Sequence, residues 1–352
     1  TGIATYKNGG RITNDKTVLT SRDGVYYSDT KDVYFKNDVH LKDPDRDIYT
    51  DSLLYNIKTN TATFIARTKI KGKDGTVINT KSGTYNLGTG EAVFTDGASF
   101  KDSTRSGSAK EIAYDKKNNT LQMRGNAKLV DSVNKVLVLA GEIYSDLNQN
   151  SFLASRKPVM ILHRDGDSTY IAADTLFSGL RKYDSLERKI DKKKDTLKTA
   201  LVVQANDKDS SIRYFIGFHN VRIFNDSLQA VSDSLHYSTI DSTFKLFGEP
   251  VVWNDKSQVT GDTLLMYTQN QKPKRLYVFN NGMIINRTKE GMFNQIAGRT
   301  LNGYFIDGNI DYVRVKGSPA ESVFYPQDDD SAYVGMNRSS GDEINVYFVK
   351  KE

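Results

Sequence analysis

The stretch YNIKTNTATF, residues 55–64, decides the fold because it returns along the chain. Each copy joins an aromatic residue, a polar turn and an alternating strand. The other clear copies are YYSDTKDVYF at 26–35, YNLGTGEAVF at 85–94 and YDKKNNTLQM at 114–123. Asn, Asp, Gly, Lys and Thr in the turns favour hairpin connections. The sequence therefore predicts a stack of two-strand units.

The copies recur with a period of roughly thirty residues. The period is clearest at one anchor position in the strand after the turn. This anchor falls at Gly10, Val39, Thr68, Ala98, Ala127, Pro158, Val221, Pro250, Met283 and Pro319. The step between the sixth and seventh anchors is double, so one unit is replaced or decayed there. Each unit of such a repeat contacts mainly its neighbours.

Apolar and polar residues alternate around the anchor, as expected for a strand with one buried face. In the second unit one face carries Val33, Phe35, Val39 and Leu41, and the other carries Tyr34, Lys36, Asp38 and His40. In the strand before each tyrosine the apolar positions change parity. We therefore expect a β-bulge near Asp51 and Ser52, with counterparts near Asp233 and Asp262.

The composition agrees with a thin all-β protein. The chain has 352 residues, 38% of them hydrophobic, a mean hydropathy of −0.55, 20 Tyr, 16 Phe and only 6 Pro. We predict an elongated stack of two-strand units in an incomplete, twisted β-jellyroll. Residues 1–179 and 211–352 are expected to belong to one stack. Residues 180–210 are expected to form a lysine-rich insertion or a degenerate unit.

The excess positive charge is local. Lys and Arg outnumber Asp and Glu by 49 to 43, a formal charge of +6, and residues 180–200 alone hold eight basic and four acidic residues. The remainder is nearly balanced, so no general nucleic-acid surface is expected. The basic segment itself is either a solvated loop or a contact for an anionic partner.

Signals for catalysis or metal binding are weak. The chain has no Cys, and its four His residues lack metal-ligand spacing. The bulge position that holds Asp51 is occupied by Arg22, Lys110 and Gly141 in other units, so it tolerates reversal of charge. Nucleotide, nucleophile and zinc motifs are missing from the sequence. We therefore predict a protein that is not an enzyme and that uses no cofactor or metal.

The repeated inward positions are the candidate ligand site. Phe35, Phe64, Phe94, Met123, Leu246 and Phe279 each lie four residues before an anchor. Together with Val39, Ile70, Phe100 and Leu129, they are predicted to line the interior of the stack. Two interpretations remain open at this point. The strip fills its own core, or it lines a groove that receives a long apolar ligand.

At this pattern the chain resembles the OstA-like family of lipopolysaccharide-transport proteins. The family includes a periplasmic carrier and the N-terminal domain of an outer-membrane transport protein. The matching stretches are YTDSLLYN, GSAKEIAYDKKNNTLQMRGNAKL, VSDSLHYS with FKLFGEPVVW, and VTGDTLLMY. Each motif is short and degenerate, so the resemblance depends on repetition in register across nearly the whole chain.

The resemblance implies a jellyroll open along one seam, whose interior holds the acyl chains of lipopolysaccharide or a related lipid. It implies a periplasmic protein, associated with the outer membrane in some relatives, that works with other transport components. Arg181, Lys182, Lys192 and Lys193 would then contact lipid phosphates.

Both ends of the chain cut through a unit. Residues 2–12 match a second strand without its first, and residues 339–348 match a first strand without its second. We therefore expect open edges and head-to-tail self-association by strand addition. Two alternatives to the carrier remain: a structural or adhesive scaffold with a closed core, and a carbohydrate-active β-helix enzyme.

Overall fold

The chain folds into antiparallel β-strands and contains no helix among the residues that the structure describes. A computed structural model describes residues 2–14, 16–164, 167–182, 211–226, 228–238, 242–254, 256–269, 272–288, 291–307, 309–328 and 332–348. The predicted all-β class is confirmed. The contacts divide the chain into two compact units, of which the N-terminal unit holds Thr1–Leu176 and Phe224–Asp226 and the C-terminal unit holds Phe177–Ile223 and Ser227–Glu352.

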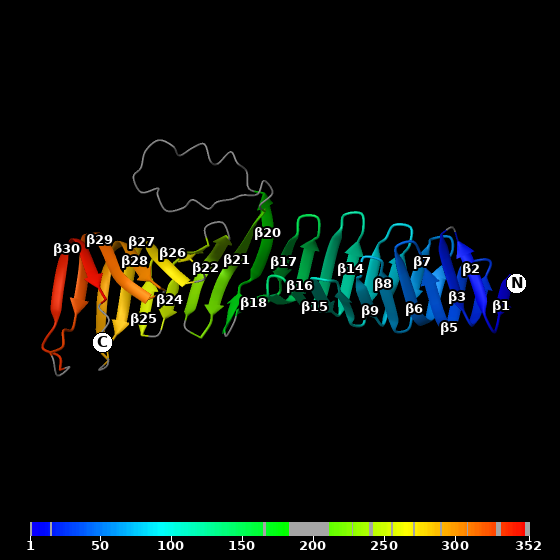
Figure 1. Cartoon of the computed structure of the whole chain (residues 1–352), viewed down its shortest axis with the longest axis horizontal. Helices are drawn as coiled ribbons and strands as arrows, with labels where there is room; N and C mark the ends of the chain where they lie inside the picture. Colours follow the sequence, from blue (N-terminus) through cyan, green and yellow to red (C-terminus); the bar gives the residue numbers. More distant parts are fainter. Residues whose placement is uncertain are drawn as a thin grey trace. The chain divides into compact units, whose positions relative to one another are not determined.

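Short hairpin-connected strands build the N-terminal unit (Figure 1). They are β1 Ile3–Tyr6, β2 Gly10–Asn14, β3 Thr17–Ser21, β4 Asp23–Tyr27, β5 Asp32–Lys42, β6 Arg46–Asn56, β7 Thr61–Phe64, β8 Thr68–Gly72, β9 Val77–Thr80, β10 Ser82–Asn86, β11 Ala92–Thr95, β12 Ala98–Lys101, β13 Arg105–Ala109, β14 Glu111–Asp115, β15 Thr120–Asp131, β16 Val136–Asp146, β17 Ser151–Ser155, β18 Val159–Arg164 and β19 Asp167–Ala172.

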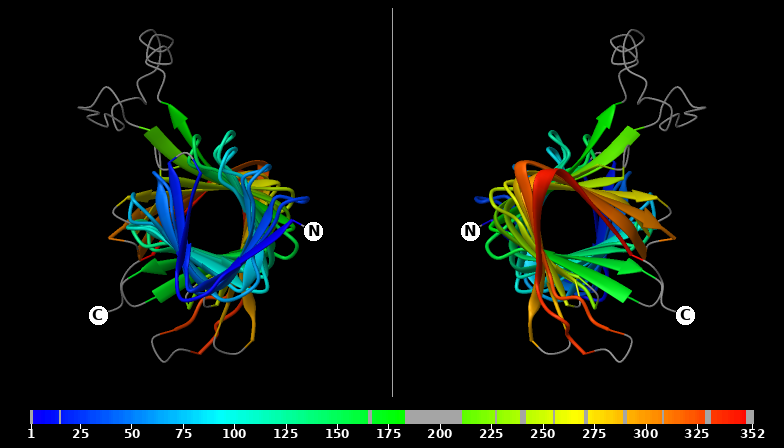
Figure 2. Two further views of the ribbon diagram at one scale, coloured as in Figure 1. Left: turned by 90° about the vertical axis from the view of Figure 1, so that its right-hand side faces the viewer. Right: turned by 90° about the vertical axis from the view of Figure 1, so that its left-hand side faces the viewer.

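These strands form two facing layers that share one corner. Layer A contains β1, β4, β7, β10, β11, β14, β17, the first halves of β5 and β15, and the second halves of β6 and β16. Layer B contains β2, β3, β8, β9, β12, β13, β18, β19 and the other halves of the long strands. Figure 2 looks along the strands' stacking direction and shows the two layers. The hairpin turns of both layers lie opposite the corner and border a seam.

Side chains pointing into the unit form continuous rows across neighbouring strands. In layer A a corner row reads Phe35, Leu53, Phe64, Gly83, Phe94, Ile112, Met123, Ile143 and Ala154. In layer B a seam row reads Leu19, Leu41, Ile48, Ile70, Ile78, Phe100, Gly107, Leu129, Val138, Met160 and Ile171. The predicted alternation is therefore confirmed for this unit.

The corner is made by residues in the left-handed backbone region. Asn37 and Asp38 have φ values of 61° and 55°, and Gly125 and Asn126 have φ values of 75° and 49°. Asn, Asp and Gly adopt this region at least cost. Two consecutive left-handed residues redirect the strand from layer A to layer B. This geometry explains why polar or glycine pairs recur just before most anchors, Thr68 after Ala66 and Arg67 being an exception.

The β-bulge predicted at Asp51 lies at the right level but on the neighbouring strand. Lys36 pairs with Ser52 and Val39 pairs with Thr50, so the extra residue belongs to β5 and not to β6. On the β6 side a small hydroxyl residue stabilises the bend, because the Thr50 hydroxyl donates a hydrogen bond to the Ser52 carbonyl over 3.3 Å. The parity change in the sequence marks the place where β6 bends. It does not mark an extra residue in β6.

The C-terminal unit repeats the two-layer plan, and its last four strands are long. Its strands are β20 Thr175–Lys182, β21 Ser211–Phe224, β22 Gln229–Ser238, β23 Thr243–Phe247, β24 Val251–Asn254, β25 Ser257–Thr260, β26 Thr263–Gln269, β27 Lys272–Arg287, β28 Phe293–Ile306, β29 Asn309–Phe324 and β30 Asn337–Tyr347. One inward row reads Leu235, Leu246, Leu264, Val278, Leu301, Val315 and Ile344.

Part of the predicted insertion is strand. β20 runs through residues 180–182, and residues 183–210 lie outside the described residues. The expectation that both parts of the chain continue one stack stays a prediction. Among the described residues, no helix is long and apolar enough to cross a bilayer.

Candidate functional site

Six of the eight inward residues predicted in the N-terminal unit are fully enclosed. Phe35, Phe64, Phe94 and Met123 occupy the corner row of layer A, and the exposed fraction of each is between 0 and 2%. Val39 and Ile70 in layer B are 2% and 1% exposed. The Phe64 and Phe94 rings stack with centroids 6.2 Å apart. These residues form packed core in this structure.

The other predicted lining residues differ in environment. Phe100 and Leu129 point inward and are only half-buried, and Leu246 is 4% exposed. Phe279 lies on the outward face, because the inward residue of that strand is Val278, which pairs with Leu264 and Leu301. The prediction that Phe279 points inward is therefore wrong, and the inward residue is its neighbour Val278. The longer strand β27 has two left-handed residues after Phe279, which shifts the frame.

The predicted phosphate contacts cannot be placed. Arg181 and Lys182 end β20, but the structure does not describe their side chains. Lys192 and Lys193 lie outside the described residues. Their role therefore stays a prediction.

A second inward row in layer A runs along the seam and was not singled out as a site from the sequence. It reads Tyr26, Val33, Tyr55, Ala62, Tyr85, Ala92, Tyr114, Leu121, Ser145 and Phe152. From Tyr26 to Tyr114, every second strand of this row carries a tyrosine. The strands between them carry Val33, Ala62 and Ala92. The tyrosines are the aromatic residues that open each copy of the repeat, so their recurrence is the signal that could have identified the row.

A side-chain cluster closes the seam at its N-terminal end. Asn14 in layer B donates hydrogen bonds to the Tyr55 hydroxyl over 3.2 Å and to Asn60 Oδ1 over 3.0 Å. The Tyr55 hydroxyl also donates to Asn60 Oδ1 over 3.0 Å. Tyr55 is 2% exposed. We call these three residues the seam latch.

Two further contacts cross the seam beyond the latch. The Arg46 guanidinium carbon lies 4.5 Å from the centroid of the Tyr85 ring, a cation–π contact. Burial raises the pKa of Tyr85 to about 12. Lys116 Nζ lies 2.8 Å from Asp45 Oδ2, and this hydrogen bond lowers the pKa of Asp45. These contacts join residues of layer A to residues much earlier in layer B.

Beyond these bridges several residues of the seam rows are half-buried, although Gly107, Ser145 and Val138 in the same rows stay buried. In layer A the half-buried residues are Tyr114, Leu121 and Phe152, and in layer B they are Ile78, Phe100 and Leu129. We call these six residues the apolar groove. An added Cβ at Gly107 would meet the Phe100 ring at 2.3 Å and Met123 Cε at 3.0 Å. Phe100 and Met123 therefore fill the interior beside Gly107, and Met123 itself is 0% exposed.

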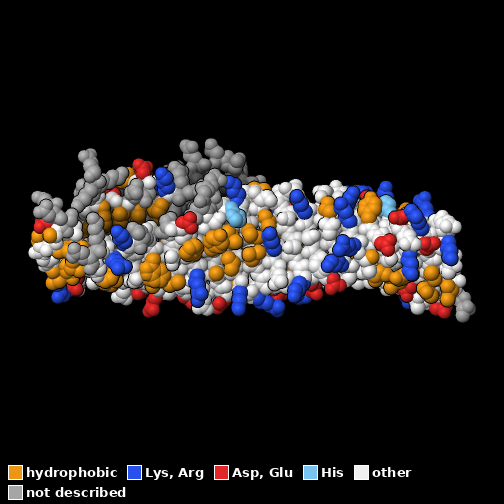
Figure 3. Space-filling view, turned by 90° about the horizontal axis from the view of Figure 1, so that it is seen from below, with side chains coloured by type: hydrophobic (Ala, Val, Ile, Leu, Met, Phe, Trp, Pro, Cys, Tyr) orange, Lys and Arg blue, Asp and Glu red, His pale blue; other side chains and the backbone are white. Residues whose placement is uncertain are grey.

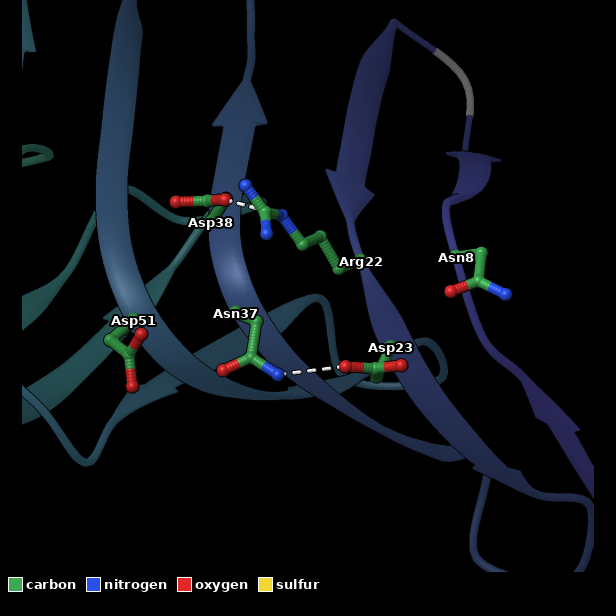
Figure 4. Close-up of a pocket in the computed structure, with 6 residues that line it drawn as sticks. All are labelled: Asn8, Arg22, Asp23, Asn37, Asp38 and Asp51. Atoms are coloured by element: carbon green, nitrogen blue, oxygen red, sulfur yellow. Dashed lines mark hydrogen bonds and ion pairs between the residues drawn. The ribbon is translucent and has the colours of Figure 1, made fainter.

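A polar pocket lies outside the corner of the N-terminal unit (Figure 4). Its lining residues are Asn8, Arg22, Asp23, Asn37, Asp38 and Asp51. Arg22 Nε lies 2.6 Å from Asp38 Oδ2, and Asn37 Nδ2 donates to Asp23 Oδ2 over 2.7 Å. These contacts join neighbouring strands at the bend. The described residues contain no group of three or more His, Asp or Glu side chains placed to hold a metal ion.

A family model matches the first repeats of the chain. Residues 1–51 match the family model described as OstA-like protein. No curated protein matches the chain. The matched residues run from β1 into β6 and include the left-handed pairs Asn8–Gly9 and Asn37–Asp38. The match supports membership of the OstA-like family. It does not distinguish a carrier protein from a domain of an outer-membrane protein.

Proposed function

We propose that this protein is a non-catalytic lipid carrier of lipopolysaccharide transport in the periplasm, holding acyl chains between its two β-layers. The observation that carries the proposal is the set of inward apolar rows that run from strand to strand. Neighbouring strands about 4.8 Å apart present nearly equivalent apolar surfaces, so a bound chain can move between similar positions. The OstA-like match of residues 1–51 supports the same class of protein.

Burial energy is sufficient for such a role. Sheltering about six methylenes of one acyl chain contributes roughly 5 kcal/mol. A lipid with several acyl chains would bind more tightly in proportion to the chains that it buries. Binding of this type needs no catalytic group, cofactor or metal.

The proposal includes assembly through the sheet edges. Among the described pairings, β1 and β2 pair only with β4 and β3, and β30 pairs only with β29. Each therefore has one edge that can accept a strand from another chain. Head-to-tail copies or other transport components, including proteins at the outer membrane, are the proposed partners.

A structural scaffold is the second candidate function. It is favoured by the enclosed first repeats, where inward residues such as Phe35, Ile48 and Phe64 are 0–1% exposed. A parallel β-helix enzyme is not favoured, because every described ladder is antiparallel.

Equilibrium binding of fluorescent lipopolysaccharide to the purified chain tests the proposal. We expect saturable binding in which intact lipopolysaccharide competes and the deacylated polysaccharide does not. The fluorescent polysaccharide without acyl chains serves as the matched control. Equal competition by the deacylated form, or no binding to the folded protein, would contradict lipid carriage and favour the scaffold.

A further inference from the structure

The inward surface of the N-terminal unit changes character along the stack. In layer A, Ala62 and Ala92 are 0% and 3% exposed, whereas Leu121 in the same cross-strand row is half-buried. In layer B, Ile48 and Ile70 are 0% and 1% exposed, whereas Phe100 in the same row is half-buried. Each layer therefore contains a half-buried stretch that follows its enclosed first strands.

The contacts across the seam account for the change. The seam latch and the Arg46–Tyr85 contact cover the enclosed part, and the Lys116–Asp45 pair is the next bridge along the chain. In each bridge the layer A residue lies about forty or more residues later in the chain than its layer B partner. Continued along the stack, a shift of about forty residues brings Leu121 to the level of Ile78 and Phe152 to the level of Gly107.

We propose that lipid enters the N-terminal unit sideways through the apolar groove, and that the latched first repeats exclude it. This inference rests on the proposed function. The proposed occupant is one acyl chain of a phosphorylated lipid, lying along the stacking direction against the half-buried side chains of the apolar groove.

The length of the groove fits one chain. The groove residues of each side span four adjacent strands, from β14 to β17 in layer A and from β9 to β15 in layer B. Three strand spacings of about 4.8 Å span about 14 Å. One leaflet of a bilayer has a hydrocarbon depth of about 15 Å, half of the roughly 30 Å core.

The charges beside the groove fit a phosphorylated headgroup. Lys117 in the layer A turn and Lys73 in a layer B turn are both exposed. The nearby carboxylates are engaged inside their own turns. Asp115 accepts the backbone N–H of Lys117 over 2.8 Å, and Asp74 accepts that of Thr76 over 2.9 Å. A lipid phosphate would meet these exposed ammonium groups beside the carboxylates of Asp45 and Asp115, with which Lys73 and Lys117 interact electrostatically.

Single-cysteine variants test the location because the natural chain has no cysteine. The test variant is Leu121→Cys. Gln122→Cys, one residue along on the opposite face, is the outward control. Ala92→Cys, in the same inward row and 3% exposed, reports on the enclosed part. The rate of maleimide modification is measured for each folded variant without lipid and with saturating hexa-acylated lipopolysaccharide.

We expect lipopolysaccharide to slow modification of Leu121→Cys at least tenfold and to leave Gln122→Cys unchanged. Ala92→Cys should stay unreactive in both conditions. If lipopolysaccharide binds but does not protect Leu121→Cys, or if it changes the reactivity of Ala92→Cys, the proposed entry is wrong while lipid carriage stands. If the unmodified chain binds no lipopolysaccharide, the proposed function fails and the inference fails with it. Ala62→Cys, also in this row, replaces Ala92→Cys if that variant does not fold.

Discussion

Tyr85 shows how a single residue of the repeat responds to its place in the fold. Its ring is buried against the Arg46 guanidinium, and its pKa is raised to about 12, chiefly by burial. Tyr114 occupies the same place one repeat later and is half-buried. The two tyrosines are equivalent in sequence, and only the seam contacts distinguish them.

The raised pKa of Tyr85 predicts a loss of stability at high pH. An unfolded tyrosine loses its proton near pH 10, whereas folded Tyr85 keeps it until about pH 12, so the free energy of unfolding falls as the pH rises through this window. Between pH 8 and 11 this loss amounts to about 1.4 kcal/mol. Urea unfolding at pH 8 and at pH 11 measures this loss. The free energy of unfolding of Tyr85→Phe should fall by about 1.4 kcal/mol less than that of the unsubstituted chain. An identical loss in both proteins would contradict the burial of the phenol.

At the scale of elements, the corner gives each unit its two-layer form. Alternation with a period of two is a local property of a strand, so the inward face could be predicted from residues such as Val33 and Phe35. The strand that carries the extra residue could not be predicted, because it depends on how β5 pairs with β6. The misplacement of Phe279 has the same origin.

The corner predicts a sharp difference between two neighbouring substitutions. Gly125 has a φ of 75°, where a side chain costs about 1–2 kcal/mol, and an added Cβ would also meet Lys110 Cδ at 2.9 Å. We expect Gly125→Ala to lower the free energy of unfolding by at least about 1 kcal/mol. Asn126→Gly should change it by only a few tenths. Urea unfolding of both variants checks this, and equal effects would contradict a left-handed corner.

At the scale of the whole molecule, the surface favours no single sign of charge. Figure 3 shows Lys and Arg side chains interspersed with Asp and Glu, and hydrophobic side chains gathered in patches on the visible face. The outward apolar residues include Tyr49, Leu139, Tyr144, Trp253 and Phe247. This distribution agrees with the near balance of charge outside residues 180–200 and gives no support to nucleic-acid binding.

The seam latch predicts controlled access to the enclosed repeats. Removing Asn14 and Asn60 in the double variant Asn14→Ala/Asn60→Ala deletes hydrogen bonds worth about 1 kcal/mol each. In a chain that also carries Ala62→Cys, which pairs with Tyr55, we expect maleimide modification to become roughly tenfold faster because local opening costs less.

The matched control for the latch is Asn118→Ala, which removes an exposed turn asparagine away from these residues. It should leave the modification rate of Ala62→Cys unchanged. A rate that is the same in the latch variant and in the control would show that packing of Tyr55, and not its hydrogen bonds, closes this end of the seam.

The sequence by itself determined the repeat, the all-β class and the inward face of most strands, because hairpin turns and side-chain alternation are local. Only the tertiary structure decided which inward residues are enclosed. Asn14 contacts Tyr55 across 41 residues of chain, and Lys116 contacts Asp45 across 71. Contacts between the layers depend on their register across the seam, which no single unit of the repeat specifies. The opening at Leu121 and Phe100 is therefore a property of the stacked units and not of any one motif.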